Sequence, residues 1–176
     1  KLHAPNWFIE NQDGSKNPHD EIDNPFRSAE VLQAHVDEGL HYARKNRLPK
    51  PIANFIPEHQ GTLKMGYFFQ KAKEKNLKIN ENDFRYKGPI PQSKETAILM
   101  LADGCEAALR AMNINASDNE ALETISRIIY SRYKDGQLDD SNLSKGEIFL
   151  IKRAFLNVWK RIRHRRIQYP TTKNNT

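Results

Sequence analysis

The fold of this chain is decided by Ser93-Lys94-Glu95-Thr96-Ala97-Ile98-Leu99-Met100-Leu101-Ala102-Asp103-Gly104-Cys105-Glu106-Ala107-Ala108-Leu109-Arg110-Ala111-Met112. Ser93 follows Pro91 and is a favoured N-cap residue, and Glu95 falls in the first turn, where a carboxylate interacts well with the helix dipole. Every residue from 97 to 102 is apolar, whereas a surface helix carries a polar stripe there. We therefore predict a long helix starting after Ser93 that the rest of the domain surrounds.

Asp103 comes directly after this apolar run. At 3.6 residues per turn it lies beside Leu99 and Glu106, off the centre of the main apolar stripe, which consists of Ile98, Leu101, Ala102, Cys105 and Leu109. Burying a lone carboxylate is costly unless a cation, a metal or several donors meet it. The helix alone leaves two interpretations open: Asp103 faces water near Arg110, or it is a ligand inside the domain.

The composition describes one globular domain. The chain has 176 residues, of which 38% are hydrophobic and 28% charged, and this length can bury a real core. A net charge of +6 suits an anionic partner such as a nucleotide, a nucleic acid or a membrane surface, without choosing among them. The single cysteine, Cys105, excludes an internal disulfide and is better explained as a small core residue than as a nucleophile.

The ends of the chain carry little targeting information. No apolar run approaches the length of a membrane span, and no signal peptide is present. The chain starts at Lys1 rather than Met, so we expect it to be a fragment of a longer protein. We expect one domain over residues 1–170, with a disordered tail over residues 171–176.

The rest of the chain predicts helices and no strands, so the expected fold class is all-α. A helix over residues 25–46 begins at Pro25, and a shorter one over residues 52–56 ends at Pro57. Thr62 is expected to cap the helix that follows. Ser117 with Glu120, and Ser144 with Glu147, have the spacing of capping boxes at the start of the last two helices.

Several polar residues have both a structural and a functional explanation. His35 falls on the apolar face of its helix, where it is either a core residue bonded to a carbonyl or a ligand. His59 lies at a helix–helix junction, where it either caps or binds a ligand. Arg85 and Lys94 are either phosphate contacts or ordinary surface cations, and the basic run 160–166 is either a solvated helix end or a binding patch.

Five stretches of the chain, in order, carry a family resemblance. They are Phe8-Ile9-Glu10-Asn11-Gln12, Asn17-Pro18-His19-Asp20, Ile56-Pro57-Glu58-His59-Gln60-Gly61-Thr62, Gly88-Pro89-Ile90-Pro91-Gln92-Ser93-Lys94-Glu95-Thr96-Ala97 and Leu99-Met100-Leu101-Ala102-Asp103. With Asp135-Gly136-Gln137-Leu138 and Arg166-Ile167-Gln168-Tyr169-Pro170, they make nearly the whole chain resemble the HD-superfamily domain of seven-transmembrane-anchored, PgpH-type phosphodiesterases, which hydrolyse cyclic di-AMP.

The resemblance implies an HD-domain-like helical bundle around a centre of two divalent metal ions, usually iron or manganese. It carries His35, His59 and Asp103 over as metal ligands, with His59 and Asp103 as catalytic residues. Many members have a second histidine where this chain has Gln60, so Gln60 is an uncertain ligand, because an amide oxygen suits these metals less well than imidazole. Lys1 resembles the lysine that follows the family's His-Asp pair, which places that pair upstream of this chain.

The implied reaction is hydrolysis of a cyclic dinucleotide, cyclic di-AMP in the first place, to a linear dinucleotide by a metal-activated water. Asn11, His19 and Arg85 are the candidate substrate-binding residues. The resemblance also implies a cytoplasmic domain of an inner-membrane protein, attached through a segment outside this chain and without a nucleic-acid partner.

Two alternatives stay open from the sequence. One is an HD domain that has lost turnover and acts as a nucleotide-binding or regulatory module, which Gln60 favours. The other is a helical RNA-binding module that uses the basic run 160–166, although no interleaved aromatic residues support it.

Overall fold

The described part of the protein is a set of helices joined by short turns. The computed structural model describes residues 5–8, 17–75 and 77–165. Within these ranges the β-structure is limited to one isolated antiparallel bridge between Lys64 and Arg85. The all-α prediction is therefore confirmed. None of the described helices combines the length and apolarity needed to cross a bilayer. The predicted tail over residues 171–176 lies outside the described residues.

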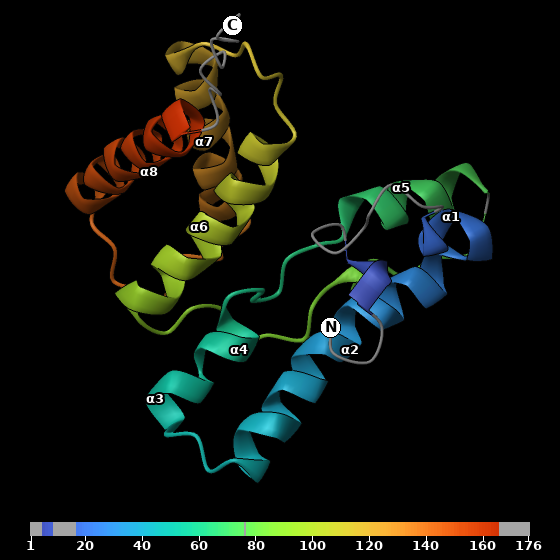
Figure 1. The fold of residues 1–176 in the computed structure, drawn as a ribbon. Helices are drawn as coiled ribbons and strands as arrows, with labels where there is room; N and C mark the ends of the chain where they lie inside the picture. The colour runs from blue at the N-terminus through green and yellow to red at the C-terminus, as the bar shows by residue number, and fades with distance from the viewer. Residues whose placement is uncertain (1–4, 9–16, 76, 166–176) are drawn as a thin grey trace, which may run out of the picture.

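The helices form two groups, which Figure 1 shows side by side. The elements in chain order are η1 (Pro5–Trp7), α1 (Pro18–Ile22), α2 (Pro25–Lys45), α3 (Lys50–Ala53), α4 (Phe55–Glu58), α5 (Gly66–Glu74), η3 (Glu81–Phe84), α6 (Lys94–Arg110), α7 (Asp118–Lys134) and α8 (Lys145–Arg165). We call η1, α1, α2, α5 and η3 the N-terminal lobe, and α6, α7 and α8 the C-terminal lobe. The short helix α4 contacts both α2 and α6 and so joins the two lobes.

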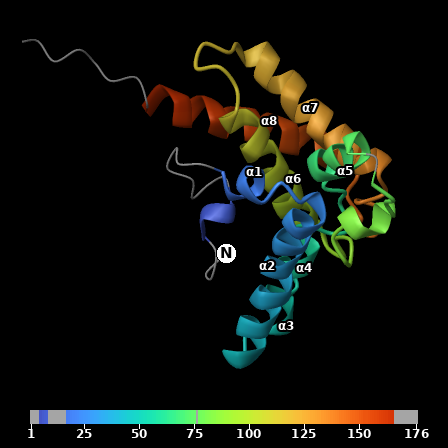
Figure 2. The same cartoon turned by 90° about the vertical axis from the view of Figure 1, so that its right-hand side faces the viewer.

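Each lobe has its own hydrophobic core. The C-terminal core consists of Ala97, Leu101, Cys105, Ile125, Ile129, Leu138 and Ile151, and the N-terminal core consists of Ala29, Met65, Phe68, Ala72 and Phe84. In the view of Figure 2, α2, α3 and α4 extend together away from α7 and α8. The helix α4, which contacts α2 on one side and α6 on the other, therefore lies at the junction between two separately packed units.

The helix starts predicted at Ser93, Ser117, Ser144 and Pro25 are confirmed. The Ser93 hydroxyl accepts a hydrogen bond from the Thr96 N–H at 3.2 Å, and Thr96 Oγ1 accepts one from the Ser93 N–H at 3.3 Å, which completes a capping box. Ser117 and Ser144 form the same reciprocal arrangement with Glu120 and Glu147. Pro25 is the first residue of α2, as predicted.

Three packing predictions are wrong. The rest of the described chain does not surround α6, because Ile98 and Leu99 are 37% and 39% exposed while α4, α7 and α8 cover the other side of the helix. Pro57 lies inside α4, close enough to its start for the missing N–H to cost nothing. Thr62 does not cap the next helix, which begins at Gly66, because its backbone and hydroxyl bond to a residue in the C-terminal lobe.

Candidate active site

Two of the predicted ligands meet at the junction of the lobes. His35 comes from the middle of α2 and His59 follows α4, and their ring centroids are 5.6 Å apart with the planes at 65°. Both side chains are half-buried. Phe8 and Tyr86 contact the His35 ring edge-on, at centroid distances of 5.5 and 6.0 Å. The fold thus brings together two imidazoles that are 24 residues apart in the sequence.

The two rings are oriented in the same way by backbone carbonyls. His35 Nδ1 lies 2.5 Å from the Leu32 carbonyl oxygen, and His59 Nδ1 lies 2.7 Å from that of Ile56. A carbonyl only accepts hydrogen bonds, so Nδ1 is the donor in both rings, and in the neutral tautomer Nε2 holds the lone pair. Metal-binding histidines characteristically use one ring nitrogen for a carbonyl and the other for the metal, so both residues fit that role.

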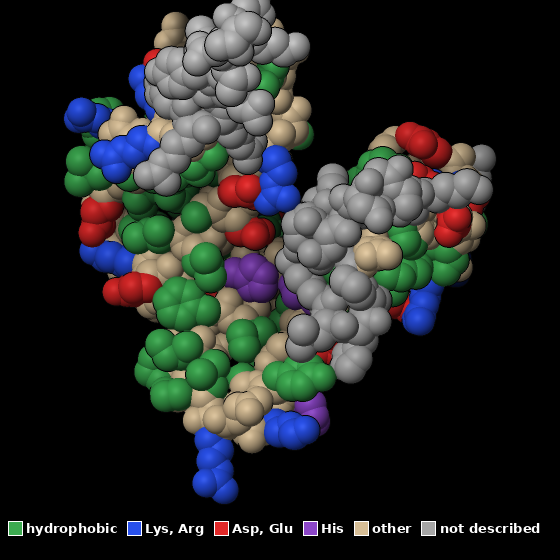
Figure 3. Space-filling model, viewed as in Figure 1, with side chains coloured by type: hydrophobic (Ala, Val, Ile, Leu, Met, Phe, Trp, Pro, Cys, Tyr) green, Lys and Arg blue, Asp and Glu red, His purple; other side chains and the backbone are tan. Residues whose placement is uncertain are grey.

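Asp103 lies on α6 in the C-terminal lobe, and its side chain is exposed. Two turns later, Arg110 donates hydrogen bonds to Glu106 at 2.9 and 2.5 Å. Over residues 5–8, 17–75 and 77–165, no three His, Cys, Asp or Glu side chains form a group that could hold a metal ion. The three-ligand site therefore stays a prediction. Figure 3 shows histidine side chains in the hollow between the lobes, beside acidic side chains.

The helix turn that carries His59 is fixed to the start of α6 by Glu58. This carboxylate is only 2% exposed. It accepts a hydrogen bond from the Thr96 hydroxyl at 2.6 Å and another from the Gln92 N–H at 2.9 Å. Buried carboxylates are stable only when donors meet them, so this contact sets the position of α4 against α6.

A second buried side chain, Gln137, holds the loop after His59. Gln137 is 1% exposed, and its Oε1 accepts from the Thr62 N–H at 3.0 Å while its Nε2 donates to Thr62 Oγ1 at 2.8 Å. Nε2 also donates to Asp135 Oδ2 at 3.0 Å. Gly61 has a φ of +53°, and a Cβ there would lie 2.4 Å from Gln137 Oε1. The loop therefore passes directly over the Gln137 amide.

Arg85 completes the connection between this loop and the C-terminal lobe. Its guanidinium donates to Asp135 at 3.2 Å, to Glu81 at 2.8 and 3.0 Å, and to the Thr62 carbonyl at 2.9 Å. The carboxylates of Asp135 and Glu81 raise the pKa of Arg85. All three guanidinium nitrogens are thus engaged within the protein, and the predicted phosphate contact of Arg85 stays a prediction.

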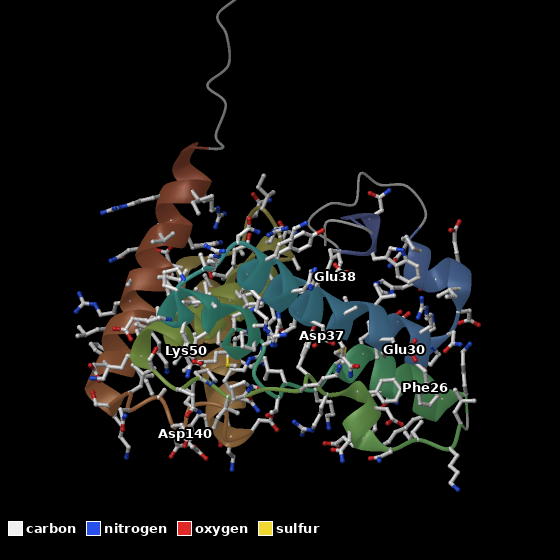
Figure 4. All side chains as sticks on the ribbon, turned by 90° about the horizontal axis from the view of Figure 1, so that it is seen from below. Phe26, Glu30, Asp37, Glu38, Lys50 and Asp140 are labelled. Carbon is white, nitrogen blue, oxygen red and sulfur yellow. The ribbon has the colours of Figure 1, made fainter. Side chains whose placement is uncertain are left out.

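A cavity of about 640 Å³ lies beside Arg85, and Tyr86, Phe26 and Glu30 are among its lining residues. Figure 4 labels Phe26 and Glu30 on α2, with Asp37 and Glu38 further along the same helix. A larger cavity, of about 860 Å³, lies between α6 and α8 and is lined by Cys105, Leu109, Phe155 and Trp159 among others. Neither His35 nor His59 lines either cavity.

The remaining predicted binding residues lie elsewhere. His19 is buried in the N-terminal lobe, with Nε2 2.8 Å from the Trp7 carbonyl oxygen and its ring against Phe68. Asn11 lies outside the described residues. Gln60 follows His59 and is half-buried. Its backbone carbonyl accepts a hydrogen bond from the Leu63 N–H at 3.1 Å. The roles of these three residues in substrate or metal binding stay predictions.

Other candidate residues have structural partners. Lys94 pairs with Glu147 across α6 and α8 at 2.6 Å, and Lys160 pairs with Asp118 at 2.5 Å. Burial raises the pKa of the Cys105 thiol to about 11, which keeps it protonated and unreactive at neutral pH.

Comparison with known proteins identifies the fold first. No family model matches the chain. The crystal structure of the Listeria monocytogenes phosphodiesterase PgpH HD domain in complex with cyclic di-AMP superimposes with a TM-score of 0.87 and 35% identity, over 92% of this chain and 75% of that chain. The architecture is therefore that of an HD domain, an all-helical class.

Two longer relatives indicate which kind of HD domain this is. The chain is 37% identical over 174 residues to the cyclic-di-AMP phosphodiesterase PgpH of Listeria monocytogenes and 38% identical over 170 residues to that of Bacillus subtilis. These matches cover 99% and 97% of this chain but only 24% of each relative. The chain belongs to the PgpH HD-domain family.

Proposed function

We propose that this domain hydrolyses a cyclic dinucleotide, cyclic di-AMP in the first place, to a linear dinucleotide in a metal-dependent reaction. One observation carries the proposal: the solved PgpH HD domain that holds cyclic di-AMP is 35% identical and shares the fold over 92% of this chain. The oriented pair His35 and His59 supports it independently, because such imidazoles suit divalent transition metals.

The proposed ligands from this chain are His35, His59 and Asp103, with the remaining ligands supplied by a His-Asp pair upstream. His59 and Asp103 would also be the catalytic residues. Two divalent ions, iron or manganese, would lower the pKa of a water and offset charge on the phosphodiester during in-line attack. Gln60 stands as an uncertain ligand, since its amide oxygen is weaker than imidazole for these metals.

The chain's own residues prepare the site for this role. The carbonyls of Leu32 and Ile56 fix the two imidazoles, so no ring rotation is needed when a ligand binds at Nε2. Glu58 and Gln137 hold the helix turn and loop on either side of His59. The net charge of +6 attracts a dianionic substrate.

The proposed reaction adds one water across one phosphodiester. A bond forms between the water oxygen and phosphorus, and the bond from phosphorus to a 3′ oxygen breaks. That oxygen leaves as a hydroxyl, which takes up one of the water protons. Asn11, His19 and Arg85 remain the proposed substrate contacts. We also propose a cytoplasmic location, with attachment to the membrane through a part of the protein outside this chain.

The test uses the protein extended upstream to the length of its relatives. Purified protein, stripped of metal and then loaded with Mn²⁺, is incubated with cyclic di-AMP, and products are separated by ion-exchange chromatography. We expect linear di-AMP to form with Mn²⁺ and not after chelation. Intact substrate after incubation with a fully loaded and folded protein would contradict the proposal.

Gln60 favours a second candidate function, a domain that binds the cyclic dinucleotide without turning it over. In that case the same protein binds cyclic di-AMP saturably and forms no linear product. Gln60→His then restores the ligand type common in the family and is expected to produce hydrolysis.

A further inference from the structure

Arg132, a cation within the C-terminal lobe, has no role in the site described so far. Arg132 comes from α7 and reaches α6 at Gly104, the residue after Asp103. A Cβ at Gly104 would lie 3.0 Å from Arg132 Nη2 and 3.2 Å from Ile128 Cγ2. Because nearly every other residue would crowd this guanidinium, the glycine makes room for a cation directly beside the proposed metal ligand.

Arg132 is half-buried between α6 and α7, and within residues 5–8, 17–75 and 77–165 one N–H of its guanidinium has no direct partner. Its Nε is fully buried, and within the described part of the chain it has no hydrogen-bond partner. Among the same residues Arg132 forms no salt bridge. Burial accordingly lowers the pKa of Arg132, and the charges of Asp135 and Asp103 act on it only at longer range, in the opposite direction. A buried N–H without an acceptor lowers stability, so packing alone does not explain the position of this side chain.

The neighbouring carboxylates do not neutralise this charge. Asp135 already accepts hydrogen bonds from Arg85 and Gln137. Asp103, under the proposed function, shares its charge with a metal ion. Arg132 therefore keeps a positive charge near Asp103 that has no committed anion among the described residues.

We propose that Arg132 is a phosphate-binding residue, whose guanidinium binds a non-bridging phosphate oxygen of the cyclic dinucleotide. This inference rests on the proposed function. Guanidinium groups suit phosphate because their planar N–H donors match its oxygens, and the bond strengthens where water is excluded. Arg132 thereby supplies the contact that Arg85, with all its nitrogens engaged, does not offer.

The experiment measures binding of cyclic di-AMP by calorimetry to the Mn²⁺-loaded, upstream-extended protein, with metal content and melting temperature recorded for each variant. Arg132→Met is expected to raise the Kd about 10- to 100-fold, the usual effect of losing a hydrogen bond between charged groups. Metal content stays unchanged, and the melting temperature does not fall, since an unpaired buried charge is removed. Arg132→Lys recovers part of the affinity, because it keeps the charge but not the planar donors.

Two further variants sharpen the result. Arg127→Met removes an exposed arginine from the same helix and is expected to leave the Kd unchanged. Gly104→Ala pushes a methyl group against Arg132 Nη2 and is expected to weaken binding without removing any charge. Should Arg132→Met fail to fold, Arg132→Lys and Gly104→Ala decide the question.

The outcomes separate this inference from the proposed function. If the wild type hydrolyses cyclic di-AMP and Arg132→Met binds it normally, only the proposed role of Arg132 is overturned. Loss of metal together with loss of binding in Arg132→Met also overturns it, because the residue then acts through Asp103. If the wild type binds cyclic di-AMP without hydrolysing it and Arg132→Met binds it more weakly, the role of Arg132 is supported and the proposed hydrolysis is overturned. A wild type that neither binds nor hydrolyses overturns both.

Discussion

Replacing Gln137 with leucine removes the side chain that ties the loop after His59 to the C-terminal lobe. Gln137 is 1% exposed and makes two hydrogen bonds to Thr62, at 3.0 and 2.8 Å. Each such bond contributes about 1 kcal/mol to stability, and leaving the Thr62 N–H without an acceptor costs about 1–3 kcal/mol more. Leucine has a similar size, so cavity formation adds little. We expect the free energy of unfolding to fall by about 3–5 kcal/mol.

The assay is urea unfolding followed by circular dichroism at 222 nm, with the free energy obtained by linear extrapolation. The control is Gln70→Leu, which changes an exposed glutamine on α5 whose amide donates to Glu74 at 3.3 Å. That variant is expected to change stability by less than about 0.5 kcal/mol. If Gln137→Leu lost no more than the control, the buried amide would not be holding the loop, and the reasoning would be refuted.

Three further predictions concern individual contacts. The Lys94 ammonium, followed by Ser144, lowers the pKa of Glu147 from its ordinary 4.5 to about 2, so the stability that this pair contributes is present above pH 4.5 and is lost as the pH falls toward 2. Lys94→Met should therefore move the acid-unfolding midpoint to higher pH, and an unchanged midpoint would count against the pairing. Gly61→Ala should lower the free energy of unfolding by more than about 2 kcal/mol, because φ is +53° and the new Cβ meets Gln137 Oε1 and Met100 Cε. Gly66→Ala, with open space around it, should be neutral or stabilising. Equal melting temperatures for the two variants would contradict this prediction. Cys105, with its thiol pKa raised to about 11 by burial, should react with a disulfide reagent at pH 8 only after unfolding, and fast labelling of the folded protein would show that the thiol is accessible.

Local signals in the sequence predicted the helix starts correctly. Ser93, Ser117 and Pro25 act within three or four residues of themselves, so their roles depend little on the rest of the fold. The all-α class was also predicted correctly, because the spacing of apolar residues along each helix is itself a local signal. The lengths of the long helices followed from these signals with small differences at the ends, but the single short helix expected over residues 52–56 is two short helices, α3 and α4.

Predictions that depended on distant parts of the chain were less successful. An apolar run such as Ile98-Leu99 indicates burial, but the sequence does not say which side of α6 its neighbours cover. Thr62 has the chemistry of a cap, yet its partner is Gln137, 75 residues later. Nothing local marks Gln137 as unusual, since its importance comes from burial at the junction of two lobes. The same is true of Arg132, whose unpaired Nε is buried only because α6 and α7 pack together.

The candidate site illustrates the same limit. His35 and His59 were chosen as ligands with the help of the family resemblance, and the fold places their rings together. The hydrogen bonds to Leu32 and Ile56 follow from helix geometry, because a histidine ring on a helix reaches the carbonyl three residues back. The pairing of Asp103 with these histidines depends on how the two lobes pack and stays a prediction.

Metal content is the most direct test of the central claim that His35, His59 and Asp103 bind the metal. The upstream-extended protein and its Asp103→Ala variant are loaded with Mn²⁺, desalted and measured by inductively coupled plasma mass spectrometry, with helicity checked by circular dichroism. We expect bound manganese in the wild type and near-complete loss in Asp103→Ala, with helicity largely intact because Asp103 is exposed. Full manganese stoichiometry in a folded Asp103→Ala variant would contradict the assignment.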